Sequence, residues 1–302
     1  MIETHEFIDN NWGRCLSLKN NQVELVIPFE FGPRVLRYGF IGDKNHFAEF
    51  PEHKANPNKE NWYSYGGHRL WHAPEDVFRT YQPDNDPVTL EYSNSSVLIR
   101  QETEACTQLQ KEMEIRLDPE GTHVQVIHRI RNHYLFEVRL AVWAVSVMAT
   151  RGRAILPLPQ RGPHGGKNLK AQTSISLWPY TDLKDTRWQF GQKFISFRQD
   201  TSISAPQKIG IAASRGWLAY LNHAQAFVKK CAFFENQTYP DQGSAFEIYA
   251  DHKCVELESL APLIALEPGG VTEMVEDWYL LKGFDLNADE NNLDQLLSQT
   301  IP

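Results

Sequence analysis

Residues 227–281 read FVKKCAFFENQTYPDQGSAFEIYADHKCVELESLAPLIALEPGGVTEMVEDWYLL, and the expected fold follows from this stretch. Apolar and polar side chains alternate along its short runs at residues 246–249, 254–258 and 271–281. A period of two is typical of β-strands that bury one face. The turn sequences YPDQG, ADH and PGG separate the runs. The stretch therefore predicts three half-buried strands joined by turns.

Strand-like runs of the same kind fill most of the remaining chain. A leucine stripe at residues 293–297 follows three possible helix caps, Asp285, Asn287 and Asp289. Because no linker-like composition interrupts the chain, we expect one domain over residues 1–302. Its predicted architecture is a large all-β antiparallel sandwich with a short C-terminal helix. The other expected strands cover residues 23–27, 35–41, 47–50, 97–101, 109–117, 123–130, 140–148, 174–178, 194–198, 208–213 and 217–222.

Composition limits the classes of function. Apolar residues make up 41% and charged residues 23% of the 302 residues, which is typical of a soluble globular protein. The formal net charge of -8 argues against nucleic acid as the main partner, because such proteins present a basic surface. No apolar run is long enough to cross a membrane, and the start MIETHEFID lacks the pattern of a secretory signal. We expect a cytoplasmic protein without a membrane partner.

Motifs for metals and cofactors are missing from the sequence. Cys15, Cys106, Cys231 and Cys254 lie far apart and form no CxxC pair, which argues against zinc. In a cytoplasmic protein we expect them to be reduced thiols. The chain contains no G-x-S-x-G elbow, phosphate loop or dinucleotide fingerprint. We therefore expect no metal and no cofactor, and the oligomeric state stays open.

Residues 51–87 show no period and are rich in Asn, Pro, His and aromatic residues. A loop of this length in a compact domain is usually functional or disordered, and the aromatic content argues against disorder. Its segment GGHRLWHAPE carries His68, Arg69, Trp71, His72 and Glu75. Sugars need donors and acceptors for their hydroxyls and an aromatic plate for their C–H faces. The alternative is a loop held to the sandwich by an Arg69–Glu75 pair, with Trp71 in the core.

The late strands carry carboxylates. Glu256 and Glu258 are two residues apart, so in a strand they project from the same face. Like charges on one face repel unless water, a ligand or a cation meets them, so the face is either solvated or a binding site. Tyr239 and Asp241, in the YPDQG turn, join this set. A strand carboxylate near basic loop residues can act as a general base.

The segment WPYTDLKDTRW, residues 178–188, again mixes aromatic and charged residues. Asp182 and Asp185 are candidate contacts to sugar hydroxyls. The alternative is a charged loop stabilised by an Asp185–Arg187 pair. Arg34, at the exit of the turn PFEFGPR, is a further candidate contact, and Arg34 or Arg69 could lower the pKa of a nearby carboxylate.

In their order along the chain, five motifs resemble the galactose mutarotase-like superfamily over residues 23–281. They are GGHRLWHAPE, RNHYLFEVRLAVWAVSVM, WPYTDLKDTRW, YPDQG and VELESLAPLIALEPGG. Within that superfamily the chain looks closer to uncharacterised bacterial members than to true aldose 1-epimerases. The resemblance implies a super-sandwich of antiparallel sheets with a sugar site on a concave face. Its epimerases use a glutamate base on the anomeric hydroxyl and a histidine acid on the ring oxygen.

The resemblance also implies roles for single residues. The glutamate base falls on Glu258, with Glu256 as the alternative if the register shifts by two. His68 and Arg69 match a segment that contributes sugar contacts. The match of Asp182 or Asp185 to an aspartate that binds sugar hydroxyls is loose.

The expected histidine acid is replaced by Trp143 in the strand LAVWA. Trp143 can stack on a sugar but cannot donate a proton to a ring oxygen. His68 or His72 could supply the acid instead, and His133 is a further alternative in a shifted register.

The sequence suggests three functions, each with a small carbohydrate as the partner. The first is a mutarotase-like isomerase with Glu258 as base and His68 or His72 as acid. The second is a non-catalytic sugar-binding protein, favoured by Trp143 at the acid position. The third is a lyase-related or hydrolase-related domain, although lyases with this sandwich usually carry an additional helical domain. The first two require Glu258 and the segment 66–75 to share a hollow sized for a pyranose.

Overall fold

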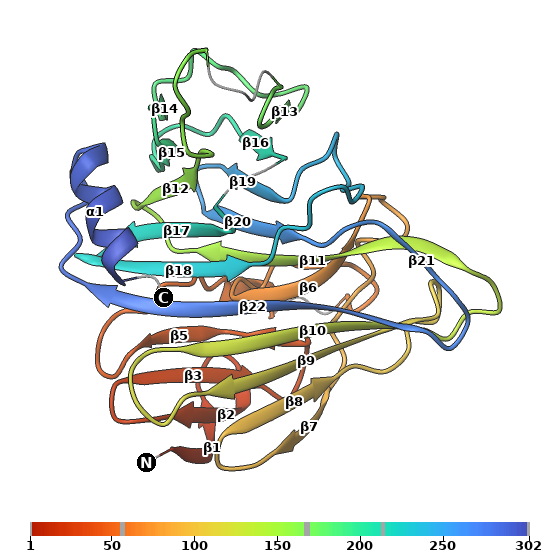
Figure 1. Ribbon diagram of the computed structural model, residues 1–302. Helices are drawn as coiled ribbons and strands as arrows, with labels where there is room; N and C mark the ends of the chain where they lie inside the picture. The colour runs from red at the N-terminus through yellow and green to blue at the C-terminus, as the bar shows by residue number, and fades with distance from the viewer. Residues whose placement is uncertain (1, 55–57, 166–169, 213–214, 301–302) are drawn as a thin grey trace.

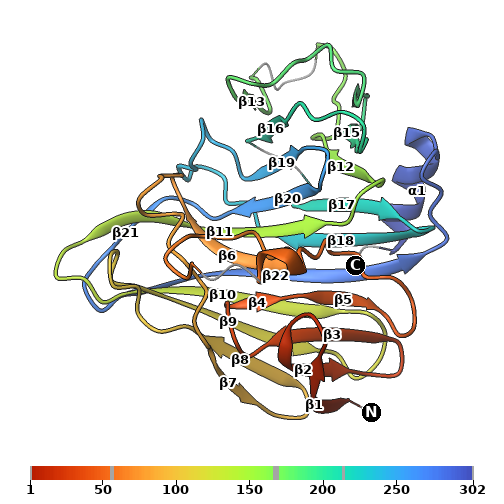
Figure 2. The same cartoon turned by 180° about the vertical axis from the view of Figure 1, so that it is seen from behind.

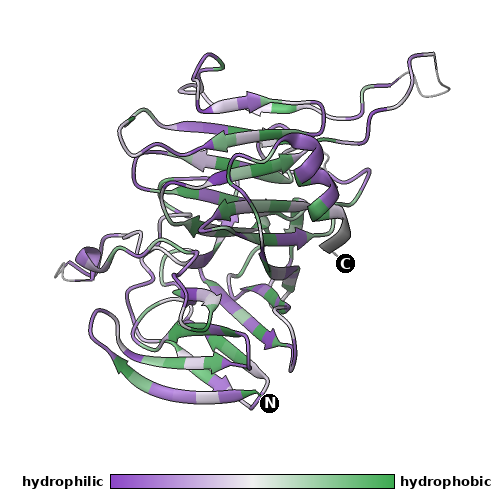
Figure 3. Cartoon of the chain, turned by 90° about the vertical axis from the view of Figure 1, so that its left-hand side faces the viewer, coloured by the Kyte–Doolittle hydropathy of each residue, from purple (hydrophilic) through white to green (hydrophobic). Residues whose placement is uncertain are grey.

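The computed structural model describes residues 2–54, 58–165, 170–212 and 215–300, which form antiparallel sheets stacked in two layers (Figures 1 and 2). One layer is a ten-stranded sheet, and the other combines an eight-stranded sheet with a four-stranded sheet. The all-β sandwich predicted from the sequence is thus confirmed. Green and purple bands alternate along many strands in Figure 3, as expected when only one strand face is buried.

The ten-stranded sheet is built around β22 (Val271–Lys282), which pairs with β10 on one side and β18 on the other. Met274, Glu276, Trp278 and Leu280 are its buried residues, so the predicted alternation is confirmed. In spatial order the sheet contains β14 (Trp188–Phe190), β15 (Phe194–Arg198), β12 (Arg153–Pro157), β17 (Trp217–Asn222), β18 (Gln225–Cys231), β22, β10 (Val124–Asn132), β9 (Leu109–Leu117), β8 (Ser96–Arg100) and β7 (Thr89–Tyr92).

The second layer holds the two smaller sheets. The eight-stranded sheet contains β13 (Ile175–Leu177), β16 (Gln207–Ile211), β19 (Phe246–Ala250), β20 (Val255–Leu260), β11 (Val138–Met148), β6 (His68–Ala73) and β4 (Arg34–Val35), with β21 (Ile264–Leu266) paired to β11. The four-stranded sheet contains β1 (Glu3–Asp9), β2 (Gly13–Lys19), β3 (Val23–Pro28) and β5 (Arg37–Phe40). The strand expected over residues 47–50 makes only single bridges, at Phe47 and Glu49.

Aromatic contacts join the two layers. Tyr38 on β5 lies against Phe227 of β18 and Trp278 of β22, with ring centroids 6.0 and 5.8 Å apart. His68 on β6 meets the same Trp278 ring at 4.6 Å. Since both smaller sheets contact the ten-stranded sheet in this way, their opposite faces point outward.

Helix α1 (Glu290–Thr300) packs on the outer face of the ten-stranded sheet (Figure 1). Leu293 and Leu297 are buried in a cluster with β-strand residues such as Trp217. The Asp289 carboxylate accepts the backbone N–H groups of residues 291 and 292, so one of the three predicted caps is used. None of the helices in the described part of the chain is long and apolar enough to span a membrane.

Strand β6 lies where the sequence suggests a long aperiodic loop. Gly66 and Gly67 precede it with φ angles of 84° and 69°, in the region that favours glycine. A Cβ atom on Gly66 would lie 2.1 Å from the carbonyl oxygen of Ala48. These glycines let the chain enter the sheet next to β4, and all six residues of β6 are buried. The expected loop is therefore wrong in its central part.

Candidate functional site

A cavity of about 340 Å³ opens on the outer face of the eight-stranded sheet. Strands β6, β11, β16, β19 and β20 contribute to it, together with the segments on both sides of β6. Its volume lies within the range of small-molecule sites. The lining residues are Phe50, Glu52, His53, Trp62, Ser64, Arg69, Trp71, Glu75, Tyr81, Trp143, Tyr180, Lys208, Tyr249, Asp251, Lys253, Cys254, Glu256 and Glu258.

The register of the sheet gathers the charged groups of the cavity. One cross-strand row runs from Arg69 through Val145 and Glu258 to Glu247. The next row places Tyr249 between Glu256 and Lys208. Residues directly opposite each other in a sheet project from the same face. Groups from distant parts of the sequence therefore meet on one surface.

Arg69 forms one side of the cavity. Its Nη2 atom lies 3.0 Å from Glu256 Oε1, and its guanidinium lies over the Trp71 ring at 4.2 Å and the Trp62 ring at 5.4 Å. Nε and Nη1 have no hydrogen-bond partner among the described residues, although both are buried. The side chain is thus held in place while two donors stay available for a ligand.

Glu258 is anchored through one of its two carboxylate oxygens. Trp143 Nε1 donates to Glu258 Oε2 at 2.9 Å, and Lys208 Nζ lies 2.9 Å from the same oxygen. The other oxygen, Oε1, has no partner within the described chain. The side chain is only 1% exposed, so a ligand must fill the bottom of the cavity to reach it.

Lys208 connects two carboxyl groups and two indoles. Its Nζ atom lies 2.7 Å from Glu247 Oε2, besides its contact to Glu258, and 5.0 and 4.7 Å from the ring centroids of Trp143 and Trp178. Burial lowers the pKa of Lys208, but the charges of Glu247 and Glu258 outweigh burial and place it well above its usual value. The side chain is therefore an ammonium at neutral pH.

The carboxyl groups around Lys208 outnumber its single positive charge. Burial raises the pKa of Glu247 well above its usual value, and the charges of Glu258 and Asp241 raise it further against the effect of Lys208. Burial also raises the pKa of Glu256, against the opposing effect of Arg69. Glu247 is therefore the carboxyl beside Lys208 whose pKa burial raises most clearly.

The Glu247→Gln variant should therefore gain stability relative to the wild type as pH rises. A carboxyl with a raised folded-state pKa stabilises the fold fully below its unfolded pKa, near 4.5, and this contribution is lost as pH rises through the folded pKa. Glutamine keeps the shape and does not titrate. Denaturant unfolding of both proteins at pH 5, 7 and 9 measures the difference, and a difference independent of pH would contradict the raised pKa of Glu247.

The structure corrects the expected placement of His68 and His72. Both lie on β6 and alternate with Arg69 and Trp71, so they point to the core between the layers while the other two line the cavity. Burial lowers the pKa of His72 to about 3. Neither histidine faces Glu258, because a strand, unlike the expected loop, sends successive side chains to opposite faces.

His68 belongs to a buried polar network with His128, Glu276 and Lys229. His68 Nε2 and His128 Nε2 are 2.7 Å apart, and His68 Nε2 lies 4.0 Å from Glu276 Oε2. Such atoms could ligate a metal ion. However, the two imidazoles already share a hydrogen bond, and Lys229 Nζ lies 3.0 Å from Glu276 Oε1. Since these groups already contact one another, we assign no metal to them.

Several other predicted contacts lie away from the cavity. Arg34 is buried and donates to Gly66 O and Asp84 Oδ2, at 2.6 Å each. Asp185 pairs with Arg187 at 2.7 Å, as the alternative interpretation of that segment predicts. Asp182 accepts the backbone N–H of its own turn through Oδ1 and does not line the cavity.

The YPDQG turn lies behind the cavity wall. Tyr239 is buried and stacks on Phe233 at 5.1 Å. The carbonyl oxygen of Asp241 accepts the hydroxyls of Ser176 and Ser244, and its carboxyl lies beside Glu247. Neither residue lines the cavity, so the expectation that they contact a ligand directly is corrected.

The Arg69–Glu75 pair expected as an alternative is not formed, because Arg69 bonds to Glu256 instead. Glu75 lines the cavity and accepts a hydrogen bond from the Tyr81 hydroxyl. Trp71, Trp143 and Glu256 also line the cavity, as the sequence suggests for contact residues.

Sequence reasoning missed Lys208, His53 and most of the aromatic wall. Lys208 begins an expected strand whose other residues are apolar, and a charged residue in such a run is a signal for a buried partner. His53 Nδ1 donates to the Ser64 carbonyl oxygen at 2.6 Å, which leaves Nε2 for other contacts. Trp62, Tyr81, Tyr180 and Tyr249 complete the wall.

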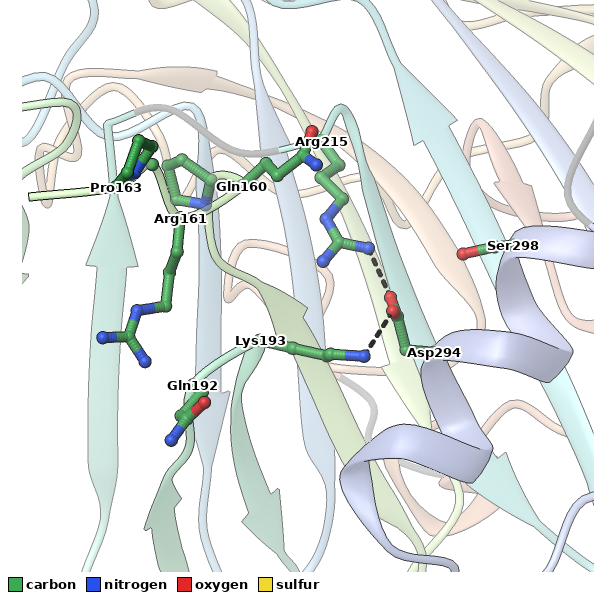
Figure 4. A pocket seen from close by; sticks show the side chains of 10 residues that line it. Gln160, Arg161, Pro163, Gln192, Lys193, Arg215, Asp294 and Ser298 are labelled. Atoms are coloured by element: carbon green, nitrogen blue, oxygen red, sulfur yellow. Dashed lines mark hydrogen bonds and ion pairs between the residues drawn. The ribbon is translucent and has the colours of Figure 1, made fainter. Parts of the chain in front are cut away.

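A larger hollow of about 830 Å³ lies beside α1, and Figure 4 shows Lys193 and Arg215 both directed at Asp294. The two ion pairs measure 2.8 and 2.5 Å. The two cations share one carboxylate and are partly exposed to solvent, which weakens their attraction for a ligand. We place the candidate site in the smaller cavity, where Arg69 and Glu258 keep free polar atoms under burial.

No protein-family model matches the chain, and no curated protein matches it. The fold is similar to that of solved structures. A candidate aldose 1-epimerase from Klebsiella pneumoniae shares 13% identity at a TM-score of 0.60, over 99% of this chain and 87% of that one. A galactose mutarotase-like protein from Lactobacillus casei shares 10% identity at a TM-score of 0.56, over 88% and 99%.

A TPR-domain containing protein from Parabacteroides distasonis is also similar, with 12% identity and a TM-score of 0.57. The match covers 92% of this chain but 48% of that protein, so the chain spans about half of its length. At these identities the likeness concerns the fold alone. The chain has a galactose mutarotase-like sandwich, and the resemblance seen in the sequence is confirmed at that level.

Proposed function

We propose that the protein binds a carbohydrate in the cavity of the eight-stranded sheet, with Glu258 and Arg69 as polar contacts. The observation that carries the proposal is a pair of buried groups with unused hydrogen-bonding atoms. Glu258 Oε1 offers an acceptor, and Arg69 Nε and Nη1 offer donors. Buried polar atoms are rarely left without partners, so unpartnered ones beside a cavity favour a polar ligand.

The aromatic lining supports a sugar over other polar ligands. The rings of Trp62, Trp71, Tyr81 and Trp143 form a continuous cluster, with centroid distances of 4.9 to 5.4 Å between neighbours. Sugars present C–H faces that pack on such rings and hydroxyls that need charged or polar partners. The likeness of the fold to galactose mutarotase-like proteins agrees with this choice.

The same geometry supports turnover as an aldose 1-epimerase-like isomerase. In this proposal Glu258 Oε1 takes the proton of the anomeric hydroxyl while the bond between the anomeric carbon and the ring oxygen breaks. Lys208 gives a proton to the ring oxygen, which replaces the expected histidine acid. The ion pair becomes a neutral acid and amine, and ring closure on the other face returns both protons. Both groups line the cavity and lie 2.9 Å apart, so one sugar ring can contact both.

Non-catalytic binding is the second candidate. Trp143 stands where the histidine acid is expected and bonds to Glu258 Oε2, so the strand that should carry the acid carries a binding residue instead. Calorimetric titration with neutral aldoses tests binding, and exchange NMR of the anomeric protons tests turnover. Binding without anomerisation supports the second candidate. If the protein binds none of the aldoses, both candidates are contradicted.

Trp62→Ala should weaken sugar binding roughly three- to tenfold, because it removes an aromatic face from the cavity wall. Tyr134→Ala is the matched control, since Tyr134 is an exposed aromatic outside the cavity lining. Calorimetry should give the wild-type affinity for the control. Equal losses in both variants, or none in the first, would contradict the site.

A further inference from the structure

We infer that the cavity selects sugars by charge: it prefers amino sugars to neutral sugars and rejects sugar phosphates and uronates. The inference rests on the proposed function and names the substrate class of the same site. It is based on the numbers of acidic and basic side chains around the cavity and on the ion pairs that the buried cations already form with carboxylates.

Carboxylates outnumber cations among the described lining residues. The acidic residues of the lining are Glu52, Glu75, Asp251, Glu256 and Glu258. The basic residues are Arg69, Lys208 and Lys253. Glu247 and Asp241 are not among the lining residues and are left out of this balance. A surplus of negative charge in a partly enclosed site attracts cations and repels anions.

The two buried cations are committed to carboxylates. Arg69 bonds to Glu256, and Lys208 lies between Glu247 and Glu258. Their side chains are 2% and 5% exposed. An anionic substituent that recruited Lys208 would have to separate it from Glu247 or Glu258 and leave a buried carboxylate unpaired, which is costly. Arg69 keeps Nε and Nη1 free, but the Glu256 carboxylate that it binds repels an anion placed there. Lys253 is exposed, where solvent weakens its attraction for an anion.

An ammonium group finds better partners in the same cavity. Glu258 Oε1 is buried and without a partner, so it can accept a charge-assisted hydrogen bond. The rings of the wall, such as Trp62 and Trp143, present faces that attract cations. The site already holds cations in this way, with Lys208 over Trp143 and Arg69 over Trp71.

Calorimetry with one hexose ring in four forms tests the inference. The forms are the 2-amino sugar at a pH where its amine is protonated, the unmodified sugar, the 6-phosphate and the uronate. We expect affinity to fall in the order amino, neutral and anionic, by roughly tenfold for each unit of charge at low ionic strength, which equals about 1.4 kcal/mol. The differences should shrink as salt is added.

Two variants separate charge selection from a general change of shape. Glu75→Gln removes one lining carboxylate but keeps an acceptor for the Tyr81 hydroxyl. The ratio of the affinities for the neutral and the anionic sugars should therefore fall several-fold. Glu120→Gln removes an exposed carboxylate in the turn after β9 and should leave the ranking unchanged.

The outcomes distinguish a failure of this inference from a failure of the proposed function. Binding of the neutral sugar with any other order of affinities overturns the inference alone. A phosphate or uronate that binds as tightly as the neutral sugar is the clearest such result. If none of the forms binds, the proposed function fails and the inference fails with it.

Discussion

Glu258→Gln should reduce the rate of sugar anomerisation by about 10²–10⁴-fold, the usual contribution of a general base, while the sugar still binds. The glutamine carbonyl can accept from Trp143 and Lys208 in place of Oε2, so the side chain keeps its position. The amide cannot take the anomeric proton. Lys208 should keep its contact with Glu247 in this variant. Exchange NMR measures the rate and calorimetry the affinity.

The Glu256→Gln variant tests which of the two glutamates is the base. Glu256 projects from the same face two residues away, but its carboxylate is engaged with Arg69. We expect this variant to affect affinity more than rate. An unchanged rate in Glu258→Gln, with a large loss in Glu256→Gln, would move the base by two residues.

Lys229→Met should destabilise the fold by about 3–5 kcal/mol, the usual cost of leaving one partner of a buried ion pair alone. Lys229 and Glu276 are both fully buried between the layers and lie 3.0 Å apart. Burial raises the pKa of Glu276, but Lys229 and His128 outweigh burial and lower it overall. Without Lys229 the carboxylate is left in the core, where Trp278 Nε1 still donates to it at 2.8 Å. Denaturant unfolding at pH 7 measures the loss.

The double variant Lys229→Met with Glu276→Gln should recover most of this stability, because it removes both charges together. Lys19→Met is the control, since it breaks an exposed pair with Glu3 and should cost less than about 1 kcal/mol. If Lys229→Met costs no more than Lys19→Met, the buried pair does not stabilise the fold as predicted.

Most of the sheet could be predicted from local alternation. The expected strands at residues 109–117, 194–198 and 217–222 agree with β9, β15 and β17 to the residue. The first of these runs alternates between buried and partly exposed residues, and the other two are short apolar runs that are buried almost throughout. The capped C-terminal helix was equally visible, because its leucine stripe has helical spacing.

The failure at β6 has a physical cause. Both faces of this strand are buried, one by the core and one by the aromatic wall, so polar residues occur on both and the period disappears. His68 and Arg69 are neighbours in sequence, yet they serve different sites. Only the strand conformation, which cannot be seen in the segment itself, separates a core histidine from a cavity arginine.

Local sequence patterns also could not predict which distant residues come together in the sheet. Arg69, Glu258 and Lys208 meet because β11 pairs with β6 and β20, and β19 joins β20 to β16. Such register is set by the whole hydrophobic pattern of the sheet and its turns. The sequence indicated that Glu256 and Glu258 share a face, but it gave no means to find their partner Lys208.

A crystal structure of the protein soaked with a neutral aldose tests the central claim most directly. We predict a sugar ring against the aromatic wall, with a hydroxyl within hydrogen-bond distance of Glu258 Oε1 and another near the free donors of Arg69. A sugar bound only elsewhere, for example in the hollow beside α1, or an unoccupied cavity at saturating sugar would contradict it.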